Sequence, residues 1–340
     1  MKKGFPEKIR VSIGSAIVLG LVRGRLDAKP TTVYLLTYQP GKCHANCRFC
    51  PQAKTSRSRA DMLSRVSWPL FTTEQVLRRI GRVAEKGAIK RVCVQALNYP
   101  TVFKDVLSLA SEIKSRVTVP ISISCQPLNR KQMKKLIDVG VNRVSIALDA
   151  ATKELFDQVK GALAGGPYVW EEHCRTLKEA VKAFGKGSVT THLIAGLGEN
   201  EKEIVQTIQW CVDTGVYPSL FAFTPMAGTA LEKRLQPSTC YYRKLQVAHF
   251  LITKGKTRYE NMRFSEDGRL IDFGVPKEVV RHVIKSGHPF LTSGCPGCNR
   301  PYYNERPGGP IYNYPQQPMR EDIIEIQKEI RMYTTTGARA

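Results

Sequence analysis

Short runs of β-branched and aromatic residues alternate with longer amphipathic stretches along most of the chain. The short runs have the length and composition of strands, whereas the longer stretches repeat their apolar positions with the period of a helix. Strands are predicted at residues 32–38, 90–95, 119–125, 143–148, 188–194, 219–224, 262–264 and 289–292. Helices are predicted at residues 73–86, 102–114, 130–139, 170–184, 201–214 and 240–254. This alternation predicts an α/β fold.

A glycine stands between several of these helices and the strand that follows it. The glycines are Gly87, Gly140, Gly187, Gly215 and Gly287. Glycine ends a helix at little cost because it adopts the left-handed conformation easily. Repeated units of helix, glycine and strand predict parallel strands joined by crossover helices. Eight such strands predict a (β/α)8 barrel of the TIM type, and a six-stranded partial barrel is the alternative because the last two strands are weakly marked.

The first 30 residues form an extension before the barrel. Apolar residues at helical spacing predict a helix that packs on the barrel, and they are Val11, Ile13, Ile17, Val18 and Leu21. The basic residues before this stretch make it similar to the beginning of a signal peptide, but no clear small-residue cleavage site follows. We therefore predict a cytoplasmic protein.

The barrel is predicted to occupy residues 31–300, and a second extension follows at residues 301–340. Residues 301–318 are rich in Pro, Gly, Tyr and Asn, which predicts an extended segment ordered by its contacts. Residues 321–333 predict a closing helix.

Composition narrows the class of protein further. The length of 340 residues suits one large α/β domain, and 42% hydrophobic residues exclude a disordered chain. No apolar run reaches the length of about 18 residues that a membrane span needs, so we expect no membrane association of that kind. Lys and Arg number 52 against 29 Asp and Glu, a net charge of +23. Such a charge suits nucleic acid, an acidic protein partner or a generally basic surface.

Three cysteines follow the first predicted strand, in the sequence Cys43-His44-Ala45-Asn46-Cys47-Arg48-Phe49-Cys50. In a parallel barrel the loops after the strands carry the active site. Three thiolates bind three irons of a [4Fe–4S] cluster and leave the fourth iron open, whereas a structural zinc site normally needs four protein ligands. The loop therefore predicts a cluster rather than zinc.

The spacing of Cys43, Cys47 and Cys50 resembles the radical S-adenosylmethionine superfamily. The resemblance implies that the three cysteines are catalytic, and that the open iron chelates the amino and carboxylate groups of S-adenosylmethionine. Electron transfer into the sulfonium then releases a 5′-deoxyadenosyl radical. Phe49 occupies the aromatic position that is usual before the third cysteine.

Further motifs resemble biotin synthase and its relatives. They include Pro51-Gln52 after the third cysteine, residues 224–229 after the sixth strand, and residues 192–199, which are similar to a G-x-I-x-G-x-x-E pattern. The resemblance implies that the cofactor is bound by Ile194, Gly196, Glu199, Pro225 and Met226. Asp149 matches the position that binds the ribose hydroxyls, and its carboxylate suits a diol. The usual Gly-Gly-Glu triplet is absent after the second strand, where Gln95 is the candidate replacement.

Biotin synthase also holds a second cluster with three cysteines and an arginine. Cys93, Cys125 and Arg263 match three of these positions, but Thr190 stands at the fourth, and a hydroxyl is a poor ligand for a soft metal. Cys295 and Cys298 form a C-x2-C pair after the last predicted strand. We therefore predict an auxiliary [4Fe–4S] cluster at the barrel mouth, bound by this pair with Cys93 and Cys125 as further ligands.

The sequence around this pair, Cys295-Pro296-Gly297-Cys298-Asn299-Arg300-Pro301, resembles the archaeal-type lipoyl synthase family, which consists of two paralogous subunits. The resemblance implies radical insertion of sulfur from the auxiliary cluster into a protein-bound octanoyl group. It also implies a paralogous second subunit, an octanoylated carrier protein and an electron donor such as ferredoxin as partners.

Two other functions remain open at this point. One is insertion of sulfur into a free small molecule, as in biotin synthesis, and the other is RNA modification. RNA is disfavoured because aromatic residues do not interleave with the basic clusters. An acidic carrier would dock on basic residues near the barrel mouth. The candidates are Lys54, Arg57, Arg59, Arg65, Arg130, Lys131, Lys134 and Lys135.

Overall fold

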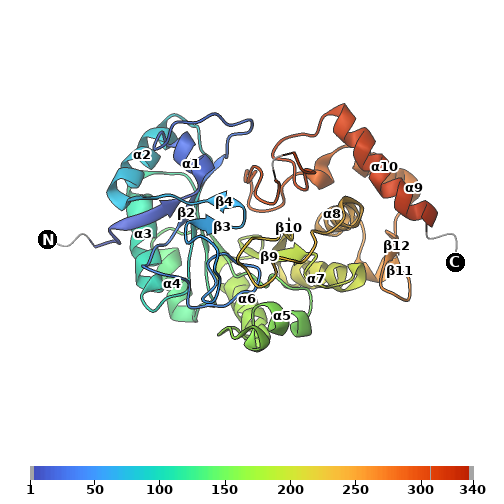
Figure 1. Cartoon of the computed structure of the whole chain (residues 1–340), viewed down its shortest axis with the longest axis horizontal. Helices are drawn as coiled ribbons and strands as arrows, with labels where there is room; N and C mark the ends of the chain where they lie inside the picture. The colour runs from blue at the N-terminus through green and yellow to red at the C-terminus, as the bar shows by residue number, and fades with distance from the viewer. Residues whose placement is uncertain (1–3, 307, 337–340) are drawn as a thin grey trace.

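One mixed sheet runs through the computed structural model, which describes residues 4–306 and 308–336 (Figure 1). Across the sheet the strands are β10 (Val216–Ala222), β9 (Val189–Ala195), β8 (Arg143–Ser145), β7 (Ile121–Ser124), β6 (Arg91–Gln95), β2 (Thr32–Leu36), β1 (Lys8–Val11) and β5 (Leu70–Thr72). The six strands from β10 to β2 are parallel. Strand β1 pairs antiparallel with both β2 and β5. The predicted α/β class is confirmed.

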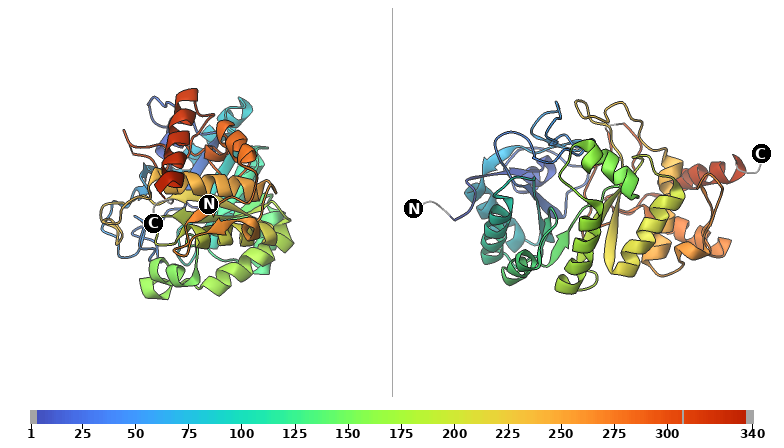
Figure 2. Two further views of the ribbon diagram at one scale, coloured as in Figure 1. Left: turned by 90° about the vertical axis from the view of Figure 1, so that its right-hand side faces the viewer. Right: turned by 90° about the horizontal axis from the view of Figure 1, so that it is seen from below.

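Helices join the parallel strands and pack along the outer side of the curved sheet (Figures 1 and 2). They are α2 (Thr73–Glu85), α3 (Val102–Arg116), α4 (Arg130–Asp138), α5 (Lys153–Val159), α6 (Trp170–Phe184), α7 (Glu201–Thr214) and α8 (Thr239–Thr253). Buried Val92 of β6 and Leu77 of α2 belong to one apolar core, and Leu193 of β9 and Ile208 of α7 to a second. The sheet thus buries its outer face under helices, as the hydrophobic pattern predicts.

Helix α7 shows how local sequence sets these boundaries. Asn200 and Glu203 form a reciprocal capping box at its start, and Gly215 ends it in the left-handed conformation with a φ of 84°. The cap satisfies backbone donors that have no partner inside the helix, and glycine takes the left-handed position without a steric penalty. The sequence contains both signals, so this helix was predictable with its bounds.

Two of the predicted barrel strands do not join the sheet. Arg263–Phe264 forms strand β11, which pairs with β12 (Leu270–Asp272) in a separate hairpin. His288–Phe290 is a 3-10 helix, and only Leu291 makes a bridge, to Tyr314. Pro289 favours this outcome because its ring has no N–H to give to a strand neighbour. The six parallel strands correspond to the partial barrel that was the alternative prediction.

The amino-terminal extension also differs from the helix that was predicted for it. Val11 lies in β1, and only Ile13–Val18 forms the short helix α1. Ser12 ends the strand and caps the helix, because its side chain accepts a hydrogen bond from the Ser15 amide at 3.4 Å. The extension therefore contributes a strand to the main sheet.

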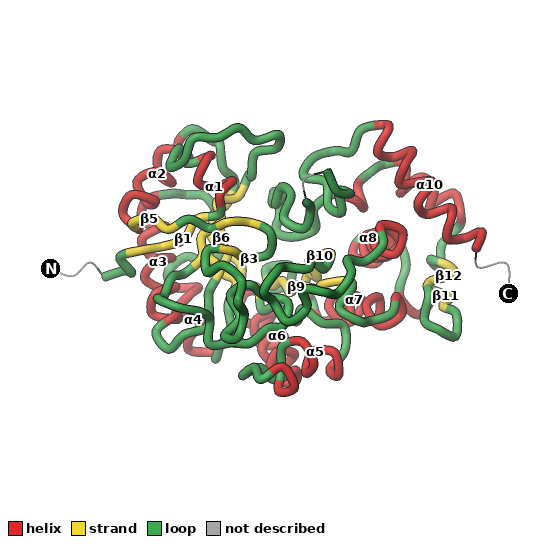
Figure 3. Tube along the Cα trace, in the orientation of Figure 1, coloured by secondary structure: helices red, strands yellow, loops and turns green. Residues whose placement is uncertain are grey.

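Residues 292–305 close the space that the six parallel strands leave open. On one side, Ser293 Oγ accepts a hydrogen bond from the Leu220 amide of β10 at 2.7 Å. On the other side, Asn299 Oδ1 accepts from the Thr31 amide just before β2 at 3.0 Å, and its Nδ2 donates to Lys29 O at 2.9 Å. Figure 3 shows this segment as a loop between the two halves of the molecule.

The rest of the carboxyl-terminal extension is ordered by buried contacts. The carboxylate of Glu305 accepts hydrogen bonds from the amides of Asn304, Tyr312 and Asn313 at 2.9 to 3.1 Å. Helices α9 (Lys277–Lys285) and α10 (Arg320–Thr336) pack beside α8, with a shared apolar core. The extended segment and the closing helix are both found. None of the helices in the described ranges has the length and apolarity that a membrane crossing requires.

Replacing Asn299 by alanine tests the closing role of residues 292–305. The variant loses the hydrogen bonds to Thr31 and Lys29, and the amide and carbonyl they satisfy are only partly shielded from water. We expect the free energy of unfolding to fall by about 1–3 kcal/mol, measured by urea denaturation. A variant as stable as the parent chain would contradict this role.

Candidate active site

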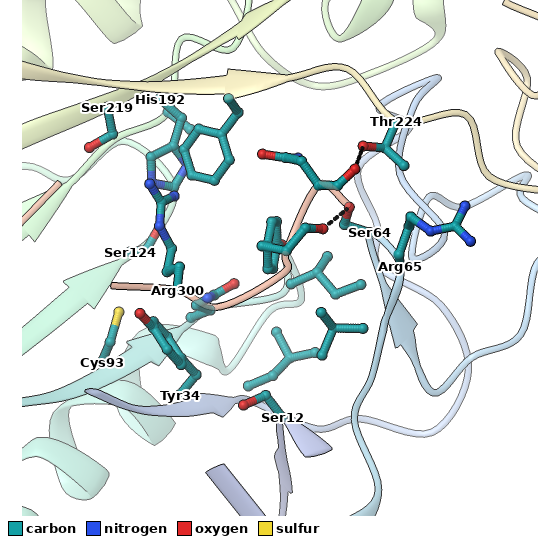
Figure 4. Close-up of a pocket in the computed structure, with 18 of the residues that line it drawn as sticks. Ser12, Tyr34, Ser64, Arg65, Cys93, Ser124, His192, Ser219, Thr224 and Arg300 are labelled. Carbon is teal, nitrogen blue, oxygen red and sulfur yellow. Dashed lines mark hydrogen bonds between the residues drawn. The ribbon is translucent and has the colours of Figure 1, made fainter. Parts of the chain in front are cut away.

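A cavity of about 1060 Å³ lies inside the curve of the strands (Figure 4). Both predicted cysteine groups line it. Four of the predicted cofactor-binding residues also line it, namely Phe49, Gln95, Asp149 and Ile194. The cavity is larger than most small-molecule pockets, which measure about 300–1000 Å³. It therefore has room for more than one ligand.

Cys43, Cys47 and Cys50 lie in the loop that follows the carboxyl end of β2. Backbone contacts hold this loop in place: the Asn98 amide donates to Cys43 Sγ at 3.1 Å, and the Cys43 amide donates to Gln52 O at 2.9 Å. Gln52 extends the network, because its Nε2 donates to Ala60 O at 2.8 Å. The loop therefore presents its three sulfurs to the cavity on an ordered frame.

The chemistry of these three sulfurs fits an iron–sulfur cluster. Burial raises the pKa of Cys47 well above its usual range and that of Cys50 to about 12. Buried thiols of this kind become thiolates readily when a metal compensates the charge. Among the residues in the described ranges, no three His, Cys, Asp or Glu side chains converge on one ion position. A cluster needs no such convergence, because each thiolate binds a different iron.

Asp149 follows β8 and is held in a left-handed conformation, with a φ of 66°. Its amide donates to His192 O at 2.8 Å, and the Ile194 amide donates to its carbonyl at 2.8 Å, so β9 fixes its position. Its carboxylate Oδ2 accepts a hydrogen bond from the buried Lys160 ammonium at 2.6 Å. The carboxylate therefore reaches the cavity already paired with a cation.

The Lys160 ammonium also acts on the first cysteine loop. It lies 5.2 Å from the ring centroid of Tyr168 and 5.7 Å from that of Phe156, so aromatic faces surround it. Burial raises the pKa of Cys47, and the charge of Lys160 opposes that shift. Sequence analysis missed this residue, whose only signal is a lysine directly after the amphipathic helix α5, close after Asp149.

Four predicted cofactor-binding residues do not line the cavity, namely Gly196, Glu199, Pro225 and Met226. Glu199 instead orders the turn after β9, because its carboxylate accepts hydrogen bonds from the Gly196 and Leu197 amides at 2.6 and 3.0 Å. Tyr241 Oη donates to the same carboxylate at 2.7 Å. The glycine and the acid in this motif thus shape the strand end that carries Ile194.

The second cysteine group lies at the opposite end of the strands. Cys298 Sγ is 2.9 Å from Tyr34 Oη of β2, and Cys295 Sγ is 3.6 Å from Ser122 Oγ of β7. A side chain at Gly297, between them, would meet Lys90, directly before β6. This is the amino end of the parallel strands, whereas Cys43, Cys47 and Cys50 follow the carboxyl end of β2. The expectation that the pair lies at the barrel mouth is therefore wrong.

Of the two further cysteines predicted as ligands, Cys93 is the one that lies near Cys295 and Cys298. Burial raises its pKa, and the nearby sulfurs of Cys295 and Cys298 add to the shift. Cys125 lines the cavity too, but burial alone raises its pKa to about 12. Cys93 therefore lies within electrostatic reach of Cys295 and Cys298, whereas no such interaction links Cys125 to them.

Three arginines surround this second thiol group. Arg91 is 6% exposed and donates to Ser122 Oγ at 2.9 Å, while its buried Nε has no partner. The Arg300 guanidinium lies 3.8 Å from the ring centroid of Phe221, and its buried Nε also has no partner. Burial lowers the pKa of Arg143, and the nearby sulfur of Cys295 opposes this shift.

No carboxylate within the described ranges forms an ion pair with any of these three arginines. A buried cation without an anion is costly. Thiolates that carry an iron–sulfur cluster would supply the missing negative charge. The arginines at Cys93, Cys295 and Cys298 therefore fit a second cluster.

Arg263 does not belong to this site, contrary to the role implied for it by resemblance. It lies in the β11–β12 hairpin with its side chain 74% exposed, and it pairs with Asp272 at 3.3 Å. The hairpin replaces the strand that would have carried Arg263 into the barrel. Arg300, which follows Cys298 by two positions, lines the cavity instead, and the sequence analysis did not assign it a role.

The fold and the first cysteine loop together define a radical S-adenosylmethionine protein. Residues 40–211, about half of the chain, match the radical SAM superfamily, and the chain belongs to this family. Membership implies a [4Fe–4S] cluster and S-adenosylmethionine as cofactors, for which the loop at Cys43, Cys47 and Cys50 provides the ligands.

Biotin synthases are among its relatives. The biotin synthase of Nitrosopumilus maritimus is 27% identical over 261 residues, which cover 74% of each chain. The biotin synthase of Magnetococcus marinus is 28% identical over 170 residues, so the chain spans about half the length of that relative, or 49%. These relatives place the chain near the biotin synthase-like branch of the family.

Two solved structures share the fold. A methylornithine synthase gives a TM-score of 0.52 at 15% identity, and the match covers 71% of this chain and 67% of that one. An FeFe-hydrogenase maturase from Carboxydothermus hydrogenoformans gives 0.52 at 17% identity, with 72% and 55% covered. At these identities the similarity concerns the fold alone.

Iron analysis of three proteins tests for two separate clusters. After anaerobic reconstitution we expect the parent chain to bind about eight irons, that is, two [4Fe–4S] clusters. Replacing Cys43, Cys47 and Cys50 together by alanine is expected to halve the iron and sulfide, and replacing Cys93, Cys295 and Cys298 is expected to do the same. If the first of these variants binds no iron, the second site does not exist.

Replacing Lys160 by methionine tests its role beside Asp149 and Cys47. Because the variant leaves a buried carboxylate without its cation, we expect a loss of about 3–5 kcal/mol in the free energy of unfolding. We also expect weaker S-adenosylmethionine binding in calorimetry and a more negative potential of the first cluster. Lys160→Arg keeps the charge and serves as the matched control. An unchanged potential and affinity in Lys160→Met would reduce Lys160 to a purely structural residue.

Proposed function

We propose that this protein inserts sulfur into an unactivated carbon of an octanoyl group that is attached to a carrier protein. The observation that carries the proposal is the pairing of two thiol groups in one cavity. Cys43, Cys47 and Cys50 lie at its carboxyl-terminal end, and Cys93, Cys295 and Cys298 at its amino-terminal end. A substrate between them would face a radical source on one side and a sulfur source on the other.

When bound, the first cluster and S-adenosylmethionine would supply a radical able to remove hydrogen from a saturated carbon, and the second cluster would supply sulfide. The protein's own residues position these groups. Asn98 and Gln52 hold the first loop, while Lys160 pairs with Asp149 at the wall of the cavity. Asp149 is a suitable acceptor for the hydroxyls of a ribose.

The strand side chains between the two groups set the environment of the reacting carbon. Many of them are small and polar, such as Ser124, Ser145, Thr190 and Ser219. His192 is among them, and burial lowers its pKa to about 4, so it is neutral near pH 7. Neutral walls of this kind leave the arginines at Cys93, Cys295 and Cys298 as the main charge at the second site.

Two features favour a carrier-bound substrate over a free small molecule. The net charge of +23 suits an acidic protein partner. Arg263 also lies outside the cavity and Thr190 replaces a cysteine, so the ligand set expected for a biotin synthase is incomplete. The identity of 27% to a biotin synthase keeps insertion into a small molecule as the second candidate. A cytoplasmic location, a paralogous second subunit and ferredoxin as the electron donor belong to this proposal.

Mass spectrometry of an octanoylated carrier domain decides between the two candidates. We expect a thiolated octanoyl group after incubation with the reconstituted protein, a reductant and S-adenosylmethionine, and no change in dethiobiotin under the same conditions. The reverse result would establish the second candidate.

A double variant then locates the sulfur source. Replacing Cys295 and Cys298 by alanine is expected to lower the rate of thiolation at least about a hundredfold, because it removes two ligands of the second cluster. Cleavage of S-adenosylmethionine to 5′-deoxyadenosine depends on the first cluster and is measured in the same samples. Thiolation that survives in this variant would exclude a sulfur source at these two cysteines.

A further inference from the structure

One part of the cavity, which we call the arm, is lined by apolar side chains. The part inside the curve of the strands is lined mainly by small polar ones. The side chains of the arm are half-buried although they face the cavity, and they are Ile13, Leu26, Met62, Leu63, Val66 and Ile311. They come from three separate segments: the α1 region, the hairpin formed by β3 (Met62–Leu63) and β4 (Val66–Ser67), and the carboxyl-terminal extension. Figure 4 shows Ser64 and Arg65 of the hairpin at one end of this region and Cys93 and Tyr34 at the other.

Apolar side chains that face an open cavity are unfavourable unless something covers them. Each Å² of apolar surface left in water forgoes about 25 cal/mol. Leu63 and Val66 pack against the apolar cluster that contains Leu36 and Trp68, and both Cys43 and Cys298 belong to or touch that cluster. An apolar ligand in the arm would therefore reach the space between the two thiol groups.

The mouth of the arm is marked by the cavity residues that are exposed to solvent. They are Asp27, Tyr302, Arg306 and Gly308. Asp27 and Tyr302 are neighbours, since burial and the Asp27 carboxylate together raise the pKa of Tyr302. Across the mouth, Ser64 Oγ donates to Tyr303 O at 3.2 Å and joins the hairpin to residues 301–305.

Charged side chains are present at this rim, and the buried Glu305 carboxylate nearby already accepts hydrogen bonds from backbone amides. Arg65, Arg306 and Asp27 line the cavity too, and the six apolar residues are less exposed than Asp27 and Arg306. A ligand that suits this distribution has a methylene chain at one end and an acidic body at the other. An acyl chain on the lysine of an acidic carrier has both.

We propose, resting on the proposed function, that a saturated acyl chain enters between residues 26–28, the β3–β4 hairpin and residues 301–306 and 308–309. The chain lies along Leu26, Met62, Leu63 and Val66, with its end between the two thiol groups. The carrier stays outside, against Arg65 and Arg306. The arm selects medium-length saturated chains because a short chain does not reach the cavity centre.

Photo-crosslinking tests the path without any turnover. An acidic peptide carries a lysine acylated with an eight-carbon chain that ends in a diazirine, and the adducts are mapped by mass spectrometry on the reconstituted protein. We expect adducts on the residues of the arm or on the strand residues beyond it, and competition by an octanoyl peptide but not by an acetyl peptide. Adducts confined to other surfaces would overturn the proposal.

Two matched pairs of variants test the arm and its rim. Leu63→Trp fills the arm and is expected to weaken binding of the octanoyl peptide at least tenfold, whereas Ile271→Trp, on the exposed β12, is not. Arg306→Glu is expected to weaken binding of the acidic carrier in a salt-dependent way, whereas Arg263→Glu, on the β11–β12 hairpin, is not. Melting temperatures show whether each variant is folded.

The outcomes separate this proposal from the proposed function. If the parent chain thiolates the octanoyl carrier and Leu63→Trp does so with unchanged KM, the acyl path is wrong and the function stands. If the peptide crosslinks to the arm but dethiobiotin is the substrate that gains sulfur, the path stands and the function is wrong. Binding that does not depend on acyl length would overturn the selectivity of the arm.

Discussion

The six parallel strands do not close into a barrel, and the constraint on which the site depends is the gap between β10, at one edge of the sheet, and β2, which pairs on its other side with β1. Strand β10 forms one edge, and the amino end of β2 must be reached from it without further parallel strands. Residues 292–305 span this distance through Ser293 at β10 and Asn299 at Thr31. The segment that completes the barrel is therefore also the one that carries Cys295, Cys298 and Arg300 into its interior.

Electrostatics then distinguishes the two ends of the cavity. At the carboxyl end a single buried ammonium, Lys160, is balanced by Asp149 and stands beside the first cysteine loop. At the amino end Arg91, Arg143 and Arg300 have no carboxylate to pair with among the described residues. Buried charge is tolerated only when it is compensated, so the second end fits an anionic cluster. The same fold thus places one thiol group beside a lysine that is paired with a carboxylate, and the other beside three arginines that form no ion pair among the described residues.

Local patterns were sufficient for much of this account. Apolar periodicity located the six parallel strands, and the helical period followed by Gly215 marked helix α7. The spacing of Cys43, Cys47 and Cys50 identified the radical loop. By contrast, the contact between Thr31 and Asn299 joins residues far apart in the chain. No local pattern encodes such a closure, and for this reason Arg300 was missed and Arg263 was assigned wrongly.

The most direct test of the two-centre account is anomalous diffraction at the iron edge from crystals of the anaerobically reconstituted protein. The account predicts two iron centres in one cavity. The first lies at Cys43, Cys47 and Cys50, and the second lies among Cys93, Cys295 and Cys298 with arginine side chains around it. A single centre, or a second one bound at Cys125 away from Cys295 and Cys298, would contradict the account.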